Sequence, residues 1–160
     1  MPPEPERELA TFAAEVETDM IPDRVCDRVG LTVADTLGAI VAGSTDDAVD
    51  ALARRWTDGI SGGATVIGAD GGETVPPLAA LCNGAAGTVL ELDEGHRFAA
   101  GHPAIHVLPA LLADAEIGYG DSDAFVRSFV AGYEVAVRTA RALGTLRSGY
   151  HPHGVWGAVG

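Results

Sequence analysis

Apolar residues recur at three- and four-residue spacing along most of the chain, and this spacing predicts amphipathic helices. We expect helices over 7–18, 23–43, 46–58, 76–92, 104–118 and 121–143, with a further helical start close to residue 154. Only 65–67 has the composition of a β-strand. The pattern therefore predicts an all-α fold with at most a very short β segment.

The second of these helices is the longest apolar stretch in the first half of the chain. Its apolar residues fall on one face, which should be buried: Val25, Val29, Val33, Leu37, Ile40 and Val41. Gly43 is placed to end the helix. Gly38, beside Ala34 and Ala39, is expected to let a neighbouring helix approach closely.

Composition fits one soluble domain, since 47% of the 160 residues are hydrophobic. No apolar run reaches the roughly 18 residues needed to cross a bilayer. The N-terminus is acidic and rich in proline, unlike a signal or transit peptide, so the cytoplasm is the expected location. Two cysteines, Cys26 and Cys82, are too few for a disulfide framework, and we expect small core residues.

The net charge and the type of basic residue exclude some classes of function. The chain carries 23 acidic and 10 basic residues, a net charge of −13, and every basic residue is arginine. Such a surface does not suit nucleic acid or an anionic membrane, which require basic groups. It fits a protein kept soluble in high salt, and we predict a halophilic source. A genome of high GC content that favours Arg, Ala, Gly and Asp is the alternative explanation.

The histidines cluster in two loops. The run "ELDEGHRFAAGHPAIH", residues 91–106, holds three of the five, and His151 and His153 hold the others. His102 precedes Pro103 at the predicted start of a helix, where backbone N–H groups favour a neutral imidazole that can accept a proton. Asp93 could orient that ring or act as a second acid.

If the two loops meet, His102, Asp93 and His151 would form one proton-transfer site. Each has an ordinary alternative: a helix-capping residue, a solvated acid at a helix end and a solvated loop residue. His96, His106 and His153 are expected to be non-catalytic on the same reasoning.

Metal binding is the competing chemistry. His102 and His106 are four residues apart, and His151 and His153 form a second pair. Pro103 opens the helix, however, so His102 lies just outside it and the spacing is imperfect. There is no HExxH motif and no GxSxG nucleophile motif. We therefore predict neither a metal nor any other cofactor, while the metal site remains an alternative.

Four blocks in this order resemble the MmgE/PrpD family: "LTVADTLGAIVAGS", "NGAAGTVLELDEGHRFAAGHPAIHVLPALLA", "FVAGYEVAVRTARAL" and "YHPHGVWGAVG". The resemblance extends from about residue 8 to the last residue. It implies that residues 1–160 are the N-terminal part of the family's helical domain, apparently truncated and without the lid domain. The family's activities include 2-methylcitrate dehydration in propionate metabolism, cis-aconitate decarboxylation and iminodisuccinate epimerisation.

The resemblance implies a metal-independent lyase that removes a proton beside a carboxylate of a di- or tricarboxylic acid, 2-methylcitrate dehydratase-like in the first instance. A decarboxylase or an epimerase of the same family is the alternative. The family's acid and its two proline-followed histidines fall on Asp93, His102 and His151 as catalytic residues. Glu91, His96 and Arg97 fall in substrate-binding positions. Where family motifs often carry Thr after the acids, this chain has Gly95 and His96.

The last residues, 154–160, are apolar and uncharged and contain no helix cap. This predicts a fragment of a longer protein, which alone could be inactive. The expected partners are a small carboxylic acid and a second copy in a homodimer. For an inactive split product, a complementing C-terminal chain would replace the second copy.

Overall fold

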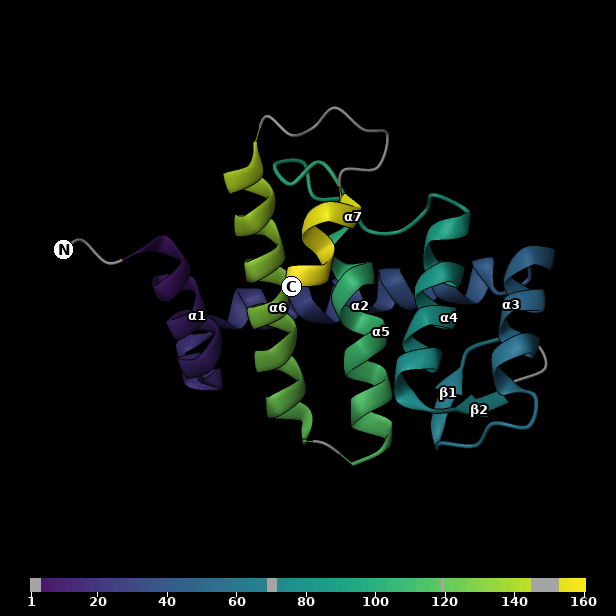
Figure 1. Cartoon of the computed structure of the whole chain (residues 1–160). Coiled ribbons are helices and arrows are strands. Elements are labelled where there is room, and N and C mark those ends of the chain that lie inside the picture. Colours follow the sequence, from purple (N-terminus) through teal and green to yellow (C-terminus); the bar gives the residue numbers. More distant parts are fainter. Residues whose placement is uncertain (1–3, 69–71, 119, 145–152) are drawn as a thin grey trace.

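The computed structural model describes residues 4–68, 72–118, 120–144 and 153–160. Figure 1 shows helices throughout, with one small β-hairpin. The helices are α1 (Pro5–Glu15), α2 (Asp23–Gly43), α3 (Asp47–Thr57), α4 (Pro76–Val89), α5 (Pro103–Glu116), α6 (Ser122–Leu143) and α7 (His153–Trp156), with 3-10 turns η1 (Thr18–Met20) and η2 (Gly157–Val159). The strands are β1 (Ala64–Val66) and β2 (Gly72–Thr74). The predicted all-α class is confirmed.

Two helices begin at a side-chain cap. The side chain of Asp46 accepts hydrogen bonds from the N–H groups of Ala48 and Val49 and starts α3. The side chain of Asp121 accepts from Ala124 and starts α6. Two helices differ most from prediction: α1 spans Pro5–Glu15 rather than 7–18, and α4 ends at Val89 rather than at residue 92. The chain turns there because Glu91 adopts a left-handed conformation, with φ of 53°.

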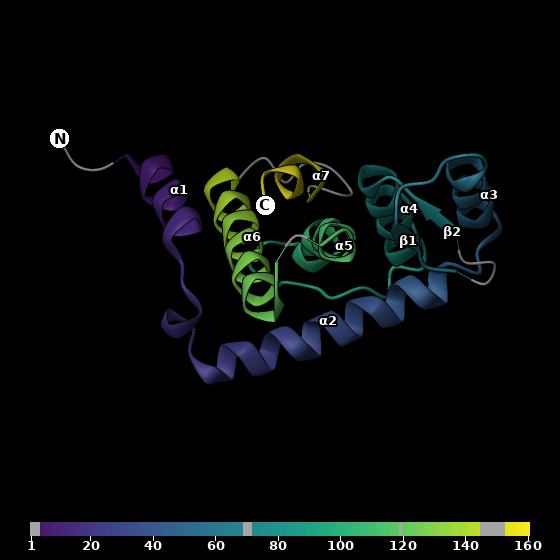
Figure 2. The same cartoon turned by 90° about the horizontal axis from the view of Figure 1, so that it is seen from below.

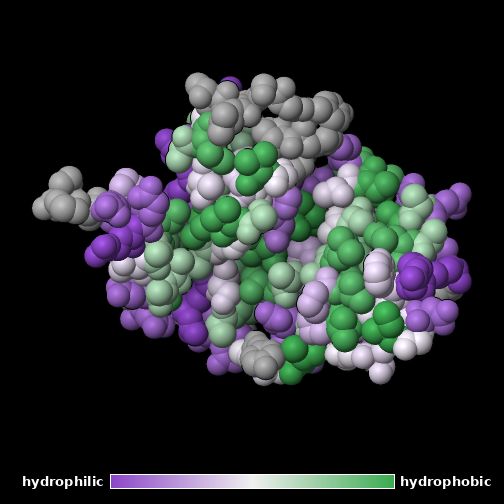
Figure 3. Space-filling model, viewed as in Figure 1, coloured by the Kyte–Doolittle hydropathy of each residue, from purple (hydrophilic) through white to green (hydrophobic). Residues whose placement is uncertain are grey.

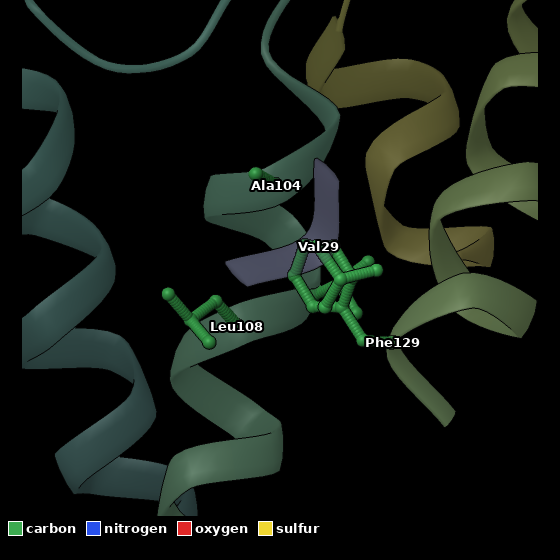
Figure 4. Packing of buried hydrophobic residues seen from close by; sticks show 5 residues of the cluster. Val29, Ala104, Leu108 and Phe129 are labelled. Carbon is green, nitrogen blue, oxygen red and sulfur yellow. The ribbon is translucent and has the colours of Figure 1, made fainter. Parts of the chain in front are cut away.

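The helices form a row that is crossed by α2. In Figure 2, α1, α6, α5, α4 and α3 stand side by side, and α2 runs along one side of the row. The central core joins α2, α5 and α6 through Val29, Ala104, Leu108 and Phe129 (Figure 4). Ala104 and Leu108 are fully buried, so the first turns of α5 lie in the middle of the domain. This burial fixes where the loop before α5 must enter.

The hairpin is anchored by side chains of the neighbouring helices. Strands β1 and β2 pair antiparallel, with Thr65 opposite Glu73. The amide of Asn83 in α4 donates to the carbonyl of Thr65 and accepts from the N–H of Ile67, both at 2.9 Å. Because Asn83 is buried, these two bonds satisfy the amide where water is excluded. The predicted β segment at 65–67 is thus found at 64–66, and the sequence pattern missed its partner strand.

Close helix contact occurs at Gly43 rather than at Gly38. A Cβ at Gly43 would overlap the carbonyl oxygen of Ala86 in α4, so only glycine permits this approach. Gly38 is exposed, with open space where its Cβ would be. The predicted role of Gly38 was wrong because it and Ala34 lie on the solvent side of α2.

Burial of other predicted core residues is mixed. Val29 and Ile40 are buried as predicted, whereas Val41 is 57% exposed. Cys82 is buried, and Cys26 is only half-buried. Val41 was misassigned because it directly follows Ile40 and so projects about 100° around the helix from it.

The surface carries many apolar side chains. Figure 3 shows hydrophobic surface over α4 and around α6, and hydrophilic surface over the outer ends of the row. A groove of 1060 Å³ lies between α1, α5, α6 and the C-terminal turn η2. Among the described helices, none has the combined length and apolarity that a membrane span requires.

Candidate active site

The loop between α4 and α5 folds back on itself. The N–H of His96 donates to the carbonyl of Gly101 at 2.8 Å, and the N–H of Ala100 donates to the carbonyl of His96 at 2.9 Å. Ala100 has a φ of 52°, which closes the turn. This fold returns the chain to its own start, so that His102 lies against Asp93 and Glu94.

His102 is the residue that precedes α5, as predicted, but its side chain does not cap the helix. Its Nδ1 lies 3.0 Å from the carbonyl oxygen of Glu94 and 3.2 Å from that of Asp93. Carbonyl oxygens only accept hydrogen bonds, so we assign the proton of the neutral ring to Nδ1. Nε2 is then the acceptor nitrogen, and 25% of the His102 side chain is exposed.

Asp93 lies beside the same ring nitrogen. Its Oδ2 is 3.4 Å from Nδ1 of His102, and its side chain is only 2% exposed. Among the described residues Oδ2 has no hydrogen-bond partner. Burial raises the pKa of the Asp93 carboxyl above its ordinary value, and the nearby His102 offsets part of this rise. The structure therefore brings Asp93 and His102 together.

Glu94 is a residue of this site that the sequence analysis did not single out. Its Oε1 accepts a hydrogen bond of 2.6 Å from the hydroxyl of Tyr133 in α6. Its Oε2 accepts one of 3.2 Å from the N–H of Ala104, in the first turn of α5. Burial and the Glu94 carboxylate raise the pKa of the Tyr133 phenol, which therefore stays a donor. The only signal in the sequence was the position of Glu94 in an acid-rich run.

The predicted substrate-binding residues lie around this pair in different environments. Glu91 and Arg97 are exposed on the loop. The ring of His96 is half-buried, 5.9 Å from the Tyr133 ring and 6.0 Å from the Phe98 ring. Nδ1 of His96 accepts from the N–H of Ala99 at 3.1 Å, so Nε2 carries the proton of the neutral ring. His96 therefore presents a donor.

The ring of His106 packs against the C-terminal segment of the described chain. Its ring packs edge-on against Trp156, with centroids 5.8 Å apart. A Cβ at Gly157 would lie 2.5 Å from the His106 ring, so η2 covers this histidine closely. This packing is compatible with a non-catalytic role for His106, which stays a prediction.

Most of the second predicted histidine loop lies outside the described residues. His151 lies outside the described residues, and so does the side chain of His153, although His153 begins α7. Within the part of the chain that the structure describes, no three His, Cys, Asp or Glu side chains form a group suited to a metal ion. The described site is therefore Asp93, Glu94 and His102, with His96 and Tyr133 beside them.

Of three comparisons with known proteins, one found a match. A search of curated proteins and a search of solved structures each found no significant match. The family model for the MmgE/PrpD N-terminal domain matches residues 7–160, nearly the whole chain. The predicted resemblance is confirmed, and the chain belongs to the MmgE/PrpD family.

Proposed function

We propose that the protein is a lyase that removes a proton from a carbon beside a carboxylate of a di- or tricarboxylic acid. Membership of the MmgE/PrpD family is consistent with a dehydratase or a decarboxylase. Within that range, dehydration of a 2-methylcitrate-like substrate is our first proposal. Decarboxylation and epimerisation are the alternatives, and the three reactions yield different products.

The observation that carries this proposal is the geometry at His102. Two backbone carbonyls face Nδ1, so a neutral ring offers Nε2 as the base. In the proposed reaction the carbon–hydrogen bond breaks, Nε2 gains the proton and the electron pair moves toward the neighbouring carboxylate. Expulsion of a β-hydroxyl then forms the carbon–carbon double bond. The departing hydroxyl takes up a proton, which the imidazolium can return, and leaves as water.

Asp93 has a defined part in this proposal. Proton transfer to Nε2 makes His102 a cation, and the Oδ2 of Asp93 lies 3.4 Å from its Nδ1. Because Asp93 is buried, its charge is poorly screened and attracts the imidazolium strongly. Asp93 would therefore stabilise the charge that develops in the transition state.

Substrate carboxylates require donors or cations. We propose that His96, through its Nε2–H, and Arg97 bind them from the loop, and that His151 serves as a partner acid or a carboxylate ligand. Glu91 would contact a hydroxyl of the substrate. The net charge of −13 makes these few donors important, because the protein as a whole repels a polycarboxylate.

Exchange of substrate hydrogen in D₂O tests the proposal directly. Proton NMR should show loss of the signal from the carbon beside the carboxylate when substrate and purified protein are incubated together, and the product identifies the reaction. His102→Ala should lower kcat about 100- to 10,000-fold, with a smaller effect on KM. Arg54→Ala, which alters an exposed residue of α3, is the control. Unchanged exchange and turnover in His102→Ala would remove His102 from the mechanism.

Association with a partner chain is the second candidate, as a homodimer or with a complementing chain. The groove of 1060 Å³ beside α1 and the exposed apolar side chains favour it. Leu92 and Phe98, for example, are 64% and 67% exposed on the loop of the candidate site. Size-exclusion chromatography with light scattering should give a mass above that of one chain. A single monomeric species at every protein concentration would contradict this candidate.

A further inference from the structure

A helix such as α5 needs an acceptor at its first turn, and the residue before it usually supplies one from its own side chain. His102 holds that position but makes no such bond. The N–H of Ala104 instead donates to Oε2 of Glu94, ten residues earlier in the chain. Because Ala104 is fully buried, water cannot replace this acceptor.

Glu94 contacts three separate parts of the site. Its carbonyl oxygen accepts from Nδ1 of His102 at 3.0 Å, and its two carboxylate oxygens accept from Ala104 and Tyr133. Tyr133 is itself fixed, since its ring packs against Phe129 of the central core at a centroid distance of 5.9 Å. Glu94 therefore holds the loop carbonyl that faces His102 at a set distance from both α5 and α6.

We propose that Glu94 is a positioning residue, which caps α5 in place of His102 and holds the His102 ring with its proton on Nδ1. This inference rests on the proposed function, in which Nε2 is the base. Glu94 does not touch the reacting atoms. It acts because a ring that no longer faces the Glu94 carbonyl can rotate or change tautomer, and the base is then misaligned.

The test measures the ring nitrogen signals of the purified protein by NMR after its histidines are labelled with ¹⁵N. The signals of His102 are identified because they are absent from the His102→Gln variant. Glu94→Ala removes both carboxylate bonds. Its His102 signals should move from those of an Nδ1–H ring toward those of a mixture of tautomers, and kcat should fall about 10- to 100-fold with less change in KM.

Glu94→Gln is the rescue variant. Its amide oxygen can accept from Ala104 while its NH₂ donates to the Tyr133 hydroxyl, so ring signals and kcat should stay within about threefold of wild type. Tyr133→Phe removes one anchor and should give an intermediate effect even if Glu94→Ala fails to fold. Asp121→Ala removes the cap of α6 without contacting His102, so it should lower stability but leave the ring signals and kcat unchanged.

Wild-type His102 signals in both Glu94→Ala and Tyr133→Phe would overturn the proposal. So would a Glu94→Gln variant as impaired as Glu94→Ala, since the charge rather than the hydrogen bonds would then matter. A wild type without turnover would contradict the proposed function alone, because the tautomer of His102 is measured without substrate.

Discussion

Oδ2 of Asp93 lies 3.4 Å from Nδ1 of His102, and no described residue donates a hydrogen bond to it. A buried carboxylate oxygen with no donor is costly while the histidine is neutral. The cost falls when the ring becomes a cation. The arrangement therefore places a buried carboxylate oxygen beside the ring nitrogen that becomes part of the imidazolium in the proposed reaction.

Replacing Asp93 by Asn should lower kcat by about tenfold, because the imidazolium loses its neighbouring charge. The loss should be smaller than for His102→Ala, since the carbonyls of Asp93 and Glu94 still face Nδ1. Steady-state kinetics with circular dichroism as a check on folding would measure this. A kcat equal to that of wild type would show that the charge of Asp93 has no part in turnover.

Asp93 also gives stability a dependence on pH. Burial raises its native-state pKa above 3.8, so the native state binds this proton more tightly than the unfolded chain does. The contribution of Asp93 to the free energy of unfolding is therefore full below pH 3.8 and is lost as pH rises through the raised native pKa.

Urea unfolding at a series of pH values should show this as a difference between proteins. Asp93→Asn cannot ionise, so relative to wild type it should gain stability as pH rises above about 4. Asp121→Asn is a control of opposite sign, because the hydrogen bond from Ala124 lowers the pKa of this exposed carboxyl. A constant stability difference between wild type and Asp93→Asn across this range would contradict the assignment.

Two glycines of the same helix should respond in opposite ways to alanine. Gly43→Ala places a Cβ against the carbonyl of Ala86 and should cost about 1–3 kcal/mol of stability. Gly38→Ala meets open space in an exposed helical position and should stabilise by about 0.4–1 kcal/mol. Thermal unfolding of both variants tests the pair. Equal effects would mean that α2 and α4 are not in the contact described.

These residues show what the sequence could predict and what it could not. Helical spacing located the long helices, and on α2 it correctly predicted the burial of Val29 and Ile40 but not the exposure of Val41, because periodicity reports only roughly which side of a helix is apolar. The same spacing could not say which glycine meets a neighbour. The small neighbours of Gly38 suggested a contact there, and Gly43 was expected only to end the helix, but the crossing point of α2 and α4 depends on tertiary packing.

Sequence reasoning likewise found some residues of the candidate site and missed others. His102 was found because a His-Pro pair at a helix start is a local feature. Glu94 was missed because its carboxylate bonds to the backbone N–H of Ala104 and the hydroxyl of Tyr133, which are 10 and 39 residues away in the chain. Their meeting depends on the reversal of the loop at Ala100, whose positive φ no hydrophobic pattern predicts.

High salt should stabilise the protein. On the described surface, Arg54 pairs with Asp50, Arg138 with Glu134 and Arg127 with Glu17. In the whole sequence, 23 acidic residues outnumber the 10 arginines. Salt screens attraction and repulsion alike, but a net charge of −13 makes repulsion the larger effect. The screening length falls from about 10 Å at 0.1 M to about 3 Å at 1 M. The unfolding temperature should therefore rise over this range of KCl.

The control is a variant in which three exposed carboxylates lose their charge, Glu6→Gln, Asp35→Asn and Asp114→Asn. This variant repels itself less, so it should be more stable than wild type in low salt and gain less from KCl. A general effect of KCl on apolar hydration would raise both unfolding temperatures equally. An unfolding temperature that is flat or falls toward 1 M KCl would contradict the halophilic prediction. It would favour genome composition as the source of the arginines and acids.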